Sequence, residues 1–248
     1  MGMIHYCKSK DGLTNYLTDG DFLYAERDGK GYRLDLFDKH YYKLRLFNGF
    51  PILEIDGLRM QLVRDFETPL DYAKEVVDHL HIAQKRTPLA QVLDTCMGLG
   101  YTAIEAAKRP GVGRVVTCEL AEPVVTLARW NPFSEPLFEK DGKITIVQGS
   151  ISERIKDMPS SSFDFIIHDP PRFSHAPELY SSGFYKELFR VAKPAGKLFH
   201  YVGSVGEKRG KHIGISAARR LVDSGFGRIR HGKRLQGIFA EKARLRKS

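Results

Sequence analysis

Apolar and polar residues alternate along the first quarter of the chain, which is the pattern of half-buried β-strands. The alternation runs through residues 22–25, 32–37 and 41–47. Segment 53–63 has the pattern of a hairpin whose turn contains Asp56 and Gly57. Residues 1–67 are therefore predicted to form a small antiparallel β unit.

The alternation gives way to helical spacing at residue 68. Thr68 is suited to cap a helix, Pro69 to occupy its first position and Asp71 to lie in its first turn. Apolar residues then recur at helical spacing up to residue 82. We expect a helix over 70–82 in a linking segment that spans 68–88. Residues 85–88 (Lys-Arg-Thr-Pro) are expected to end it.

From residue 90 onward, short apolar stretches alternate with amphipathic ones. Strands are expected at 90–93, 114–118, 143–148, 163–167 and 197–202, helices at 102–108, 123–130, 184–192 and 215–224, and a final hairpin at 227–235 and 237–243. This alternation predicts an α/β fold with a doubly wound parallel sheet over 68–248. Such sheets bind ligands beyond the carboxyl ends of their strands.

Composition narrows the class of protein. Among 248 residues, 42% are hydrophobic and 28% are charged, so the chain can bury a core. No apolar run approaches the ~20 residues that a membrane span needs. The N-terminus lacks the apolar region of a secretory signal, and Cys7, Cys96 and Cys118 show no metal-ligand spacing. We therefore expect a cytoplasmic protein without membrane association or a bound metal.

Positive charge is concentrated in the last quarter of the chain. The net charge is +9, but residues 186–248 contain 17 Lys and Arg against 4 Asp and Glu. One cluster lies at 208–211, in an expected loop after the fifth strand. Such a tract can bind a phosphate backbone without reading sequence, and it can equally be a solvated surface. RNA is accordingly an expected partner of this basic quarter, with the solvated surface as the alternative.

The segment 92–100 reads Val-Leu-Asp-Thr-Cys-Met-Gly-Leu-Gly. Gly98 and Gly100 permit a tight turn and the close approach of a ligand, and the next helix presents its free N–H groups there. The spacing also matches a dinucleotide pattern, with Glu119 where a ribose-binding acid would lie. Asp94 favours a different nucleoside, because a carboxylate suits a cationic group and repels a pyrophosphate.

This combination resembles the cofactor site of class I S-adenosylmethionine-dependent methyltransferases, over about residues 90–243. The resemblance implies S-adenosyl-L-methionine as the cofactor. The acid that ends the first strand and the glycine loop would then contact the methionine part of the cofactor. The acid that ends the second strand would contact its ribose, and the end of the third strand would contact its adenine. The cofactor-binding residues expected here are Asp94, Thr95, Gly98, Gly100, Glu119, Leu120, Ser150 and Ile151.

The loop after the fourth strand reads Asp-Pro-Pro-Arg-Phe over 169–173. Its prolines stiffen the backbone and remove two N–H donors. The loop resembles the Asp-Pro-Pro-aromatic motif of methyltransferases that modify amino groups, notably on nucleic acid bases. There the acid and the first proline carbonyl hold the NH2 and the aromatic ring stacks on the base. The resemblance implies catalytic roles for Asp169, Pro170, Arg172 and Phe173, with Arg172 where the aromatic residue would stand.

The N-terminal part carries a second resemblance. Hairpin 53–61, followed by Tyr72 and His79, is similar to the N-terminal part of spermidine synthases, whose Gln, Tyr and His reach the cofactor or amine pocket. Gln61 and Tyr72 are thus also expected at the cofactor. Those enzymes have a Gly-Gly-Gly-Asp-Gly-Gly run and two acids in an Asp-Ser-x-Asp-Pro loop, whereas Asp169 is the single acid of the corresponding loop here.

The expected fold is therefore a Rossmann-like methyltransferase sheet with a spermidine-synthase-like overall architecture. The predicted function is transfer of a methyl group from S-adenosyl-L-methionine to an amino group, with RNA as one candidate substrate. Two alternatives stay open: aminopropyl transfer from decarboxylated S-adenosylmethionine, and a non-catalytic RNA-binding protein. His168 and His175 flank the catalytic loop and could accept a proton, and residues 175–178 could form part of a substrate lid.

Overall fold

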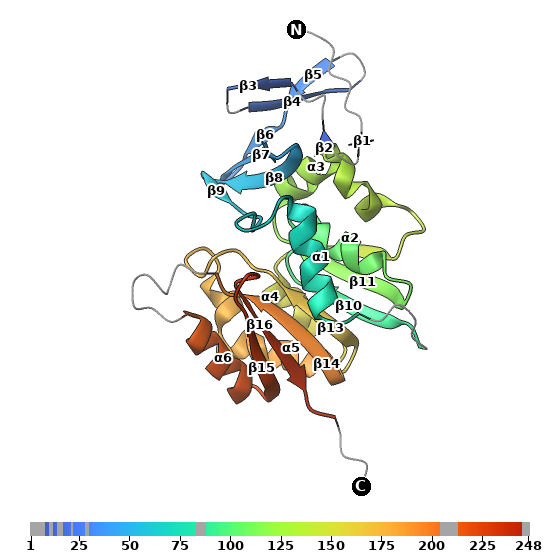
Figure 1. Ribbon diagram of the computed structural model, residues 1–248, viewed down its shortest axis with the longest axis vertical. Coiled ribbons are helices and arrows are strands. Elements are labelled where there is room, and N and C mark those ends of the chain that lie inside the picture. The colour runs from blue at the N-terminus through green and yellow to red at the C-terminus, as the bar shows by residue number, and fades with distance from the viewer. Residues whose placement is uncertain are drawn as a thin grey trace.

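Seven strands form the central sheet of the computed structural model (Figure 1). All neighbouring strands are parallel except β16, which runs antiparallel to both of its neighbours. The chain proceeds outward from β10 to β11 and β12, then returns to start the other half at β13, so the carboxyl ends of β10 and β13 flank a topological switch point. The doubly wound α/β fold is confirmed. In spatial order the strands are β12 (Ile144–Gln148), β11 (Val112–Glu119), β10 (Ala90–Asp94), β13 (Phe163–His168), β14 (Ala192–Tyr201), β16 (Gly237–Lys242) and β15 (Phe226–Gly232).

The structure describes residues 8–9, 12–13, 17–20, 22–27, 30–82, 88–203 and 213–244. The basic cluster predicted at 208–211 and most of the predicted helix break at 85–88 lie outside these ranges.

Helices cover both faces of the sheet and divide the buried residues into two cores. Successive residues of a strand point to opposite faces, so Val92 lies in one core and Leu93 in the other, as do Val115 and Val116. One core is covered by α1 (Pro69–His79), α2 (Tyr101–Ala107), α3 (Glu122–Trp130) and the 3-10 segment Pro132–Phe138. The other is covered by α4 (Ile151–Arg154), α5 (Ser182–Val191), α6 (Ile213–Asp223) and the 3-10 segments Ile155–Asp157 and Pro177–Tyr180.

The N-terminal unit is antiparallel, as predicted, and caps one end of the molecule (Figure 1). Its turns at Asn48-Gly49 and Asp56-Gly57 have positive φ at both residues, which is the backbone conformation that tight two-residue hairpins require. The unit comprises β1 (Lys8–Ser9), β2 (Gly12–Leu13), β3 (Leu17–Asp19), β4 (Phe22–Arg27), β5 (Lys30–Arg33), β6 (Asp35–Phe37), β7 (Tyr41–Phe47), β8 (Phe50–Ile55) and β9 (Leu58–Arg59).

Helix α1 connects the N-terminal unit to the sheet. Thr68 and Asp71 form a capping box at its start, with Pro69 in the first turn, as the sequence predicts. At the far edge of the sheet, Arg234 in the β15–β16 turn donates to Glu75 Oε2 at 2.5 Å and to the carbonyl of Asp65 at 3.0 Å. These hydrogen bonds connect the β15–β16 turn to α1, and α1 carries a residue of the site described next.

Candidate active site

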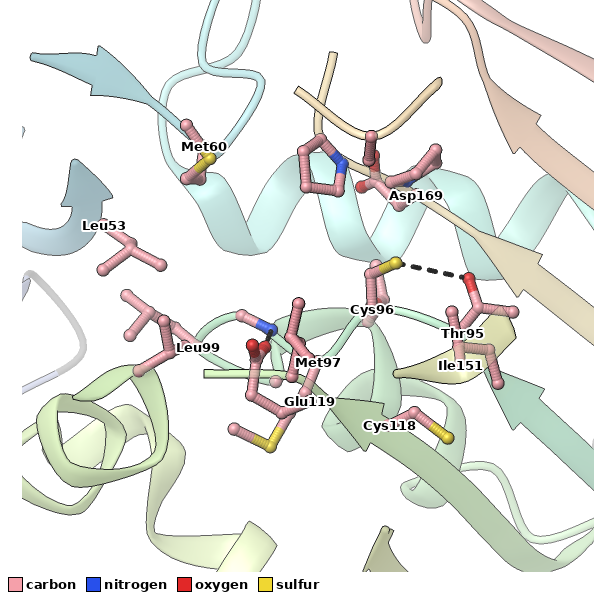
Figure 2. A pocket seen from close by; sticks show the side chains of 18 of the residues that line it. Leu53, Met60, Thr95, Cys96, Met97, Leu99, Cys118, Glu119, Ile151 and Asp169 are labelled. Carbon is pink, nitrogen blue, oxygen red and sulfur yellow. Dashed lines mark hydrogen bonds between the residues drawn. The ribbon is translucent and has the colours of Figure 1, made fainter. Parts of the chain in front are cut away.

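A cavity of about 220 Å³ opens at the carboxyl ends of β10, β11 and β13 (Figure 2). The β8–β9 hairpin and α1 contribute one wall, through residues such as Leu53 and Met60 that the sequence did not single out. The structure brings together most of the predicted site residues in the lining of this cavity: Gln61, Tyr72, Thr95, Gly98, Gly100, Glu119, Leu120, Ser150, Ile151, Asp169 and Pro170.

The glycine loop has the left-handed backbone that its sequence indicates. Gly98 has a φ of +53° and Gly100 a φ of +77°, a region that is open to glycine and strained for most other residues. Glu119 connects this loop to the turn between β11 and α3. Its carboxylate accepts hydrogen bonds from the N–H of Gly98 at 3.0 Å and from the N–H of Ala121 at 2.9 Å. Burial raises the pKa of Glu119.

Asp94 is absent from the cavity lining that the structure describes. The carboxyl group is fully buried and accepts from the hydroxyl groups of Thr117 at 2.6 Å and Thr102 at 3.2 Å. Burial raises its pKa to about 7, although the hydrogen bond from Thr117 acts in the opposite direction. These two bonds connect the end of β10 to β11 and to α2, and the contact of Asp94 with a cofactor stays a prediction.

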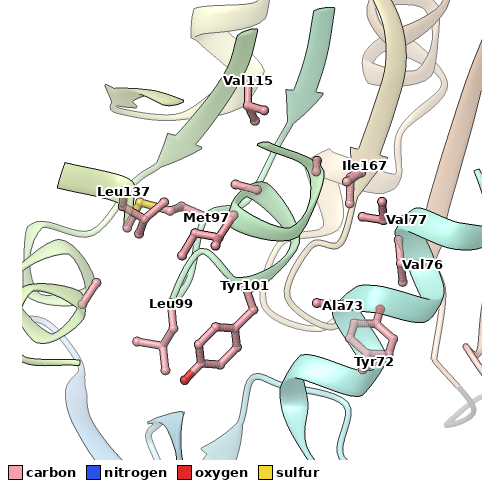
Figure 3. Packing of buried hydrophobic residues seen from close by; sticks show 14 of the residues in the cluster. Tyr72, Ala73, Val76, Val77, Met97, Leu99, Tyr101, Val115, Leu137 and Ile167 are labelled. Carbon is pink, nitrogen blue, oxygen red and sulfur yellow. The ribbon is translucent and has the colours of Figure 1, made fainter. Parts of the chain in front are cut away.

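Asp169 is held by the linking helix. The hydroxyl of Tyr72 donates to Asp169 Oδ2 at 3.0 Å. The helix that carries Tyr72 packs Ala73, Val76 and Val77 into the core that also contains Ile167, two residues before Asp169 (Figure 3). Burial raises the pKa of Asp169 to about 7, and the hydrogen bond from Tyr72 limits the rise.

This burial predicts an unusual effect of pH on stability. Because the pKa of Asp169 is about 7 in the folded chain and about 4 in an unfolded one, the folded chain binds this proton more tightly. Stability is therefore lost as the pH rises from about 4 to about 7. In Asp169→Asn this loss is absent, so the melting temperature of the variant relative to wild type should climb across that window and then level off. Scanning calorimetry from about pH 4 to about pH 9 tests this, and a constant difference would contradict it.

The remaining catalytic candidates lie outside the cavity. Arg172 and Phe173 are exposed and do not appear in its described lining. Phe173 packs edge-on against Tyr180 with ring centroids 5.5 Å apart. Tyr180 in turn donates to the carbonyl of Pro171 at 2.9 Å. This hydrogen bond stabilises the Asp-Pro-Pro loop. The catalytic roles of Arg172 and Phe173 therefore stay a prediction. The expected lid contributes His175, Ala176 and Glu178 to the lining.

His79 also lies away from the described cavity lining. Its Nδ1 is 2.9 Å from the carbonyl of Glu75, and its ring stacks on Phe239 at 5.6 Å.

Many cations of the basic quarter have partners within the chain. Lys193 pairs with Asp164 at 2.8 Å and Arg228 with Glu241 at 3.3 Å, and others donate to backbone carbonyl groups: Arg220 to Tyr180, Lys242 to Phe189 and Ala192, and Arg234 to Asp65. RNA binding by this region stays a prediction. No helix in the described ranges is long and apolar enough to cross a membrane.

Comparisons with known sequences agree with this architecture. Residues 92–196 match the family model of a methyltransferase domain. The chain is 41% identical over 237 residues to the uncharacterized protein MJ1233 of Methanocaldococcus jannaschii, which covers 95% of this chain and 79% of that protein. It is 34% identical over 123 residues to polyamine aminopropyltransferase 2 of Streptomyces coelicolor, which covers 48% of this chain and 22% of that protein.

Solved structures show the same arrangement of elements. A spermidine synthase in complex with the transition-state analogue AdoDATO superposes with a TM-score of 0.67 at 18% identity, over 86% of this chain and 77% of that one. The spermidine synthase of Thermotoga maritima gives a TM-score of 0.65 at 19% identity, over 87% of this chain and 77% of that one. The chain therefore belongs to the same family as MJ1233, with a segment that matches a methyltransferase domain and a fold like that of spermidine synthases.

Proposed function

We propose that the protein transfers the methyl group of S-adenosyl-L-methionine to an amino group. The observation that carries this proposal is the charge of the cavity. Glu119, Asp169 and Glu178 line it, whereas its described lining includes no Lys or Arg. A sulfonium cation suits such a cavity, and the pyrophosphate of a dinucleotide would be repelled by it.

The described lining fits the parts of the nucleoside. Gly98 and Gly100 leave the backbone open to close approach, and Glu119 at the end of β11 is suited to accept from ribose hydroxyl groups. Leu120 and Ile151 offer apolar surface for the adenine ring.

Gln61 supports the intact amino acid part of the donor. Its Oε1 accepts from the N–H of Leu53 at 2.6 Å. This bond turns the amide nitrogen of Gln61 toward the glycine loop, where it lies 3.6 Å from the position that a Cβ at Gly98 would take. A carboxylate beside that loop would therefore meet an amide donor.

The described residues suit an acceptor amine held for in-line attack. The donor supplies an already activated methyl group, so most of the catalysis lies in positioning. Asp169, oriented by Tyr72 at 3.0 Å, accepts an N–H of the amine, and the carbonyl of Pro170 is a second acceptor on the same loop. With a pKa of about 7, Asp169 can also take up the proton that the amine must lose.

Aminopropyl transfer from decarboxylated S-adenosylmethionine is the second candidate. The acidic cavity favours it too, because loss of the carboxylate makes the donor more cationic, and one relative is named as a polyamine aminopropyltransferase. The two donors differ in the carboxylate that the amide of Gln61 is placed to meet beside Gly98, so their relative affinities separate the two candidates.

Isothermal titration calorimetry tests the proposal. The wild-type chain is titrated with S-adenosylmethionine, its decarboxylated form and NAD. We expect the intact cofactor to bind at least about tenfold more tightly than the decarboxylated form, because the amide of Gln61 would lose a charged partner. Gln61→Glu should reverse the order by placing a carboxylate against a carboxylate. Tighter binding of the decarboxylated form to wild type would favour aminopropyl transfer, and preference for NAD would overturn both candidates.

A further inference from the structure

His168 ends the central strand β13, directly before Asp169, and its side chain is fully buried. Its Nδ1 lies 2.7 Å from the hydroxyl oxygen of Thr95, and its Nε2 lies 3.0 Å from the carbonyl oxygen of Leu179. Thr95 and Leu179 both line the cavity. One buried imidazole therefore joins two parts of the cavity wall that come from distant segments of the chain.

The partners of His168 determine which nitrogen carries the proton. The carbonyl of Leu179 can only accept, so Nε2 must be the N–H donor. Burial lowers the pKa of His168 to about 4, so the ring is neutral at physiological pH. Nδ1 is then an acceptor for the hydroxyl of Thr95, which also lies 3.6 Å from Cys96 Sγ. The ring is thus a single tautomer, in which Nε2 donates a hydrogen bond and Nδ1 accepts one.

The two segments that His168 joins correspond to the two reactants. We call residues 95–100, which contain the glycine loop, the donor wall, and residues 169–179, which contain the Asp-Pro-Pro loop and the lid, the acceptor wall. Transfer between two bound molecules is sensitive to their separation, and a displacement of about 1 Å can lower a rate about a hundredfold.

We propose that His168 is a positioning residue that holds the donor wall and the acceptor wall in register, through Thr95 on one side and the Leu179 carbonyl on the other. The inference rests on the proposed function only in that the cavity binds an S-adenosyl nucleoside, so it applies equally to methyl and aminopropyl transfer.

Other members of the same buried cluster do not make this connection. His200 stacks on His168 with ring centroids 4.4 Å apart, but its Nε2 bonds to the hydroxyl of Tyr185 at 2.7 Å. Neither His200 nor Tyr185 lines the cavity as described. The Tyr185–His200 bond therefore offers a matched control: it is a buried hydrogen bond of similar length in the same cluster, and its partners make no described hydrogen bond to either wall, although the ring of His200 contacts Tyr180 at 5.2 Å.

Two substitutions separate the two bonds. In His168→Asn the amide reaches about as far as Nδ1, so the link to Thr95 is kept and the link to Leu179 is lost. In His168→Gln the amide reaches about as far as Nε2, so the link to Leu179 is kept and the link to Thr95 is lost. The donor wall is followed by the Kd of S-adenosylhomocysteine, measured by calorimetry. The acceptor wall is followed by amide hydrogen exchange of residues 172–181, measured by mass spectrometry with that nucleoside bound.

We expect a crossed result. His168→Gln should raise the Kd about tenfold and leave exchange in 172–181 slow. His168→Asn should leave the Kd within about threefold and speed exchange in 172–181 about tenfold. Thr95→Val should match His168→Gln, and the double variant should lose no further affinity, because both substitutions break the same bond. Tyr185→Phe should lower the melting temperature and change neither readout.

The inference fails if His168→Asn and His168→Gln move the two readouts together, or if neither variant moves either readout, because a purely structural histidine would give those patterns. If wild type binds 5′-methylthioadenosine and not S-adenosylhomocysteine, the methylation proposal fails and the crossed test proceeds with that nucleoside. If wild type binds neither, the proposed function and the inference both fall.

Discussion

Asp169→Asn is expected to lower the rate of group transfer at least about a hundredfold while leaving the affinity for S-adenosylhomocysteine within about threefold. The carboxyl group lies at the end of β13, faces the cavity and is oriented by Tyr72 at 3.0 Å. Asparagine keeps one acceptor oxygen and the shape of the side chain. It loses the negative charge that steadies an amine as it becomes cationic, and it cannot take up the proton.

The rate is measured as transfer of a tritiated methyl group from S-adenosylmethionine to the acceptor that wild type modifies best in a panel of primary amines and RNA transcripts. Tyr72→Phe should cause a smaller loss, because the carboxylate remains and only its orientation is relaxed. Asp141→Asn, at an exposed position away from the described cavity lining, serves as the charge-matched control. Retention of most of the activity by Asp169→Asn would remove this residue from the reacting site.

Gly100→Ala is expected to destabilise the protein by about 3 kcal/mol and to weaken nucleoside binding severely. Gly100 has a φ of +77°, and a Cβ there would overlap with Leu137 Cδ1. Leu137 is itself packed in the core on this side of the sheet (Figure 3). The new methyl group therefore adds steric overlap to backbone strain, and relief would require the glycine loop to move.

Gly57→Ala separates these two contributions. Gly57 has a φ of +78°, nearly that of Gly100, and nothing lies within 4 Å of the position that its Cβ would take. The Gly57→Ala variant should therefore be destabilised by backbone strain alone, by about 1 kcal/mol. Its affinity for the nucleoside should be unchanged. Urea denaturation and calorimetry measure both variants. Equal destabilisation by the two substitutions would mean that Leu137 yields easily and that the loop tolerates a side chain.

The sequence allowed the strands and their functional ends to be predicted because each strand is short, apolar and followed by a residue of distinct chemistry. Glu119 and Asp169 occupy such ends and both line the cavity. The same periodicity explains why Asp94 is buried. Period-two alternation puts Asp94 on the face of Val92, which α2 covers, and the register pairs it with Thr117. A strand-end acid can thus point into the core instead of the cleft.

Other features depend on contacts between distant segments, which local patterns do not reveal. The aromatic residue that braces the Pro-Pro loop is Tyr180, supplied by a later 3-10 segment, whereas Phe173 beside the motif is exposed. The sequence indicates either RNA binding or a solvated surface for the basic quarter. In the structure, Arg234 and Lys193 bind groups that are far away in the sequence, Glu75 and Asp164. A count of charges along the chain cannot distinguish solvated cations from those that hold the fold together.

The position of β16 has a consequence for biosynthesis. This strand is the last of the sheet to be made in the described chain, yet it lies between β14 and β15 and pairs with both. While residues 237–242 are still inside the ribosome, the outer edge of β14 has no strand to pair with, and β15 has no place in the sheet. A nascent chain at that stage exposes an apolar edge that chaperones or proteases can recognise. Completion of the sheet therefore waits until residues 237–242 have left the ribosome.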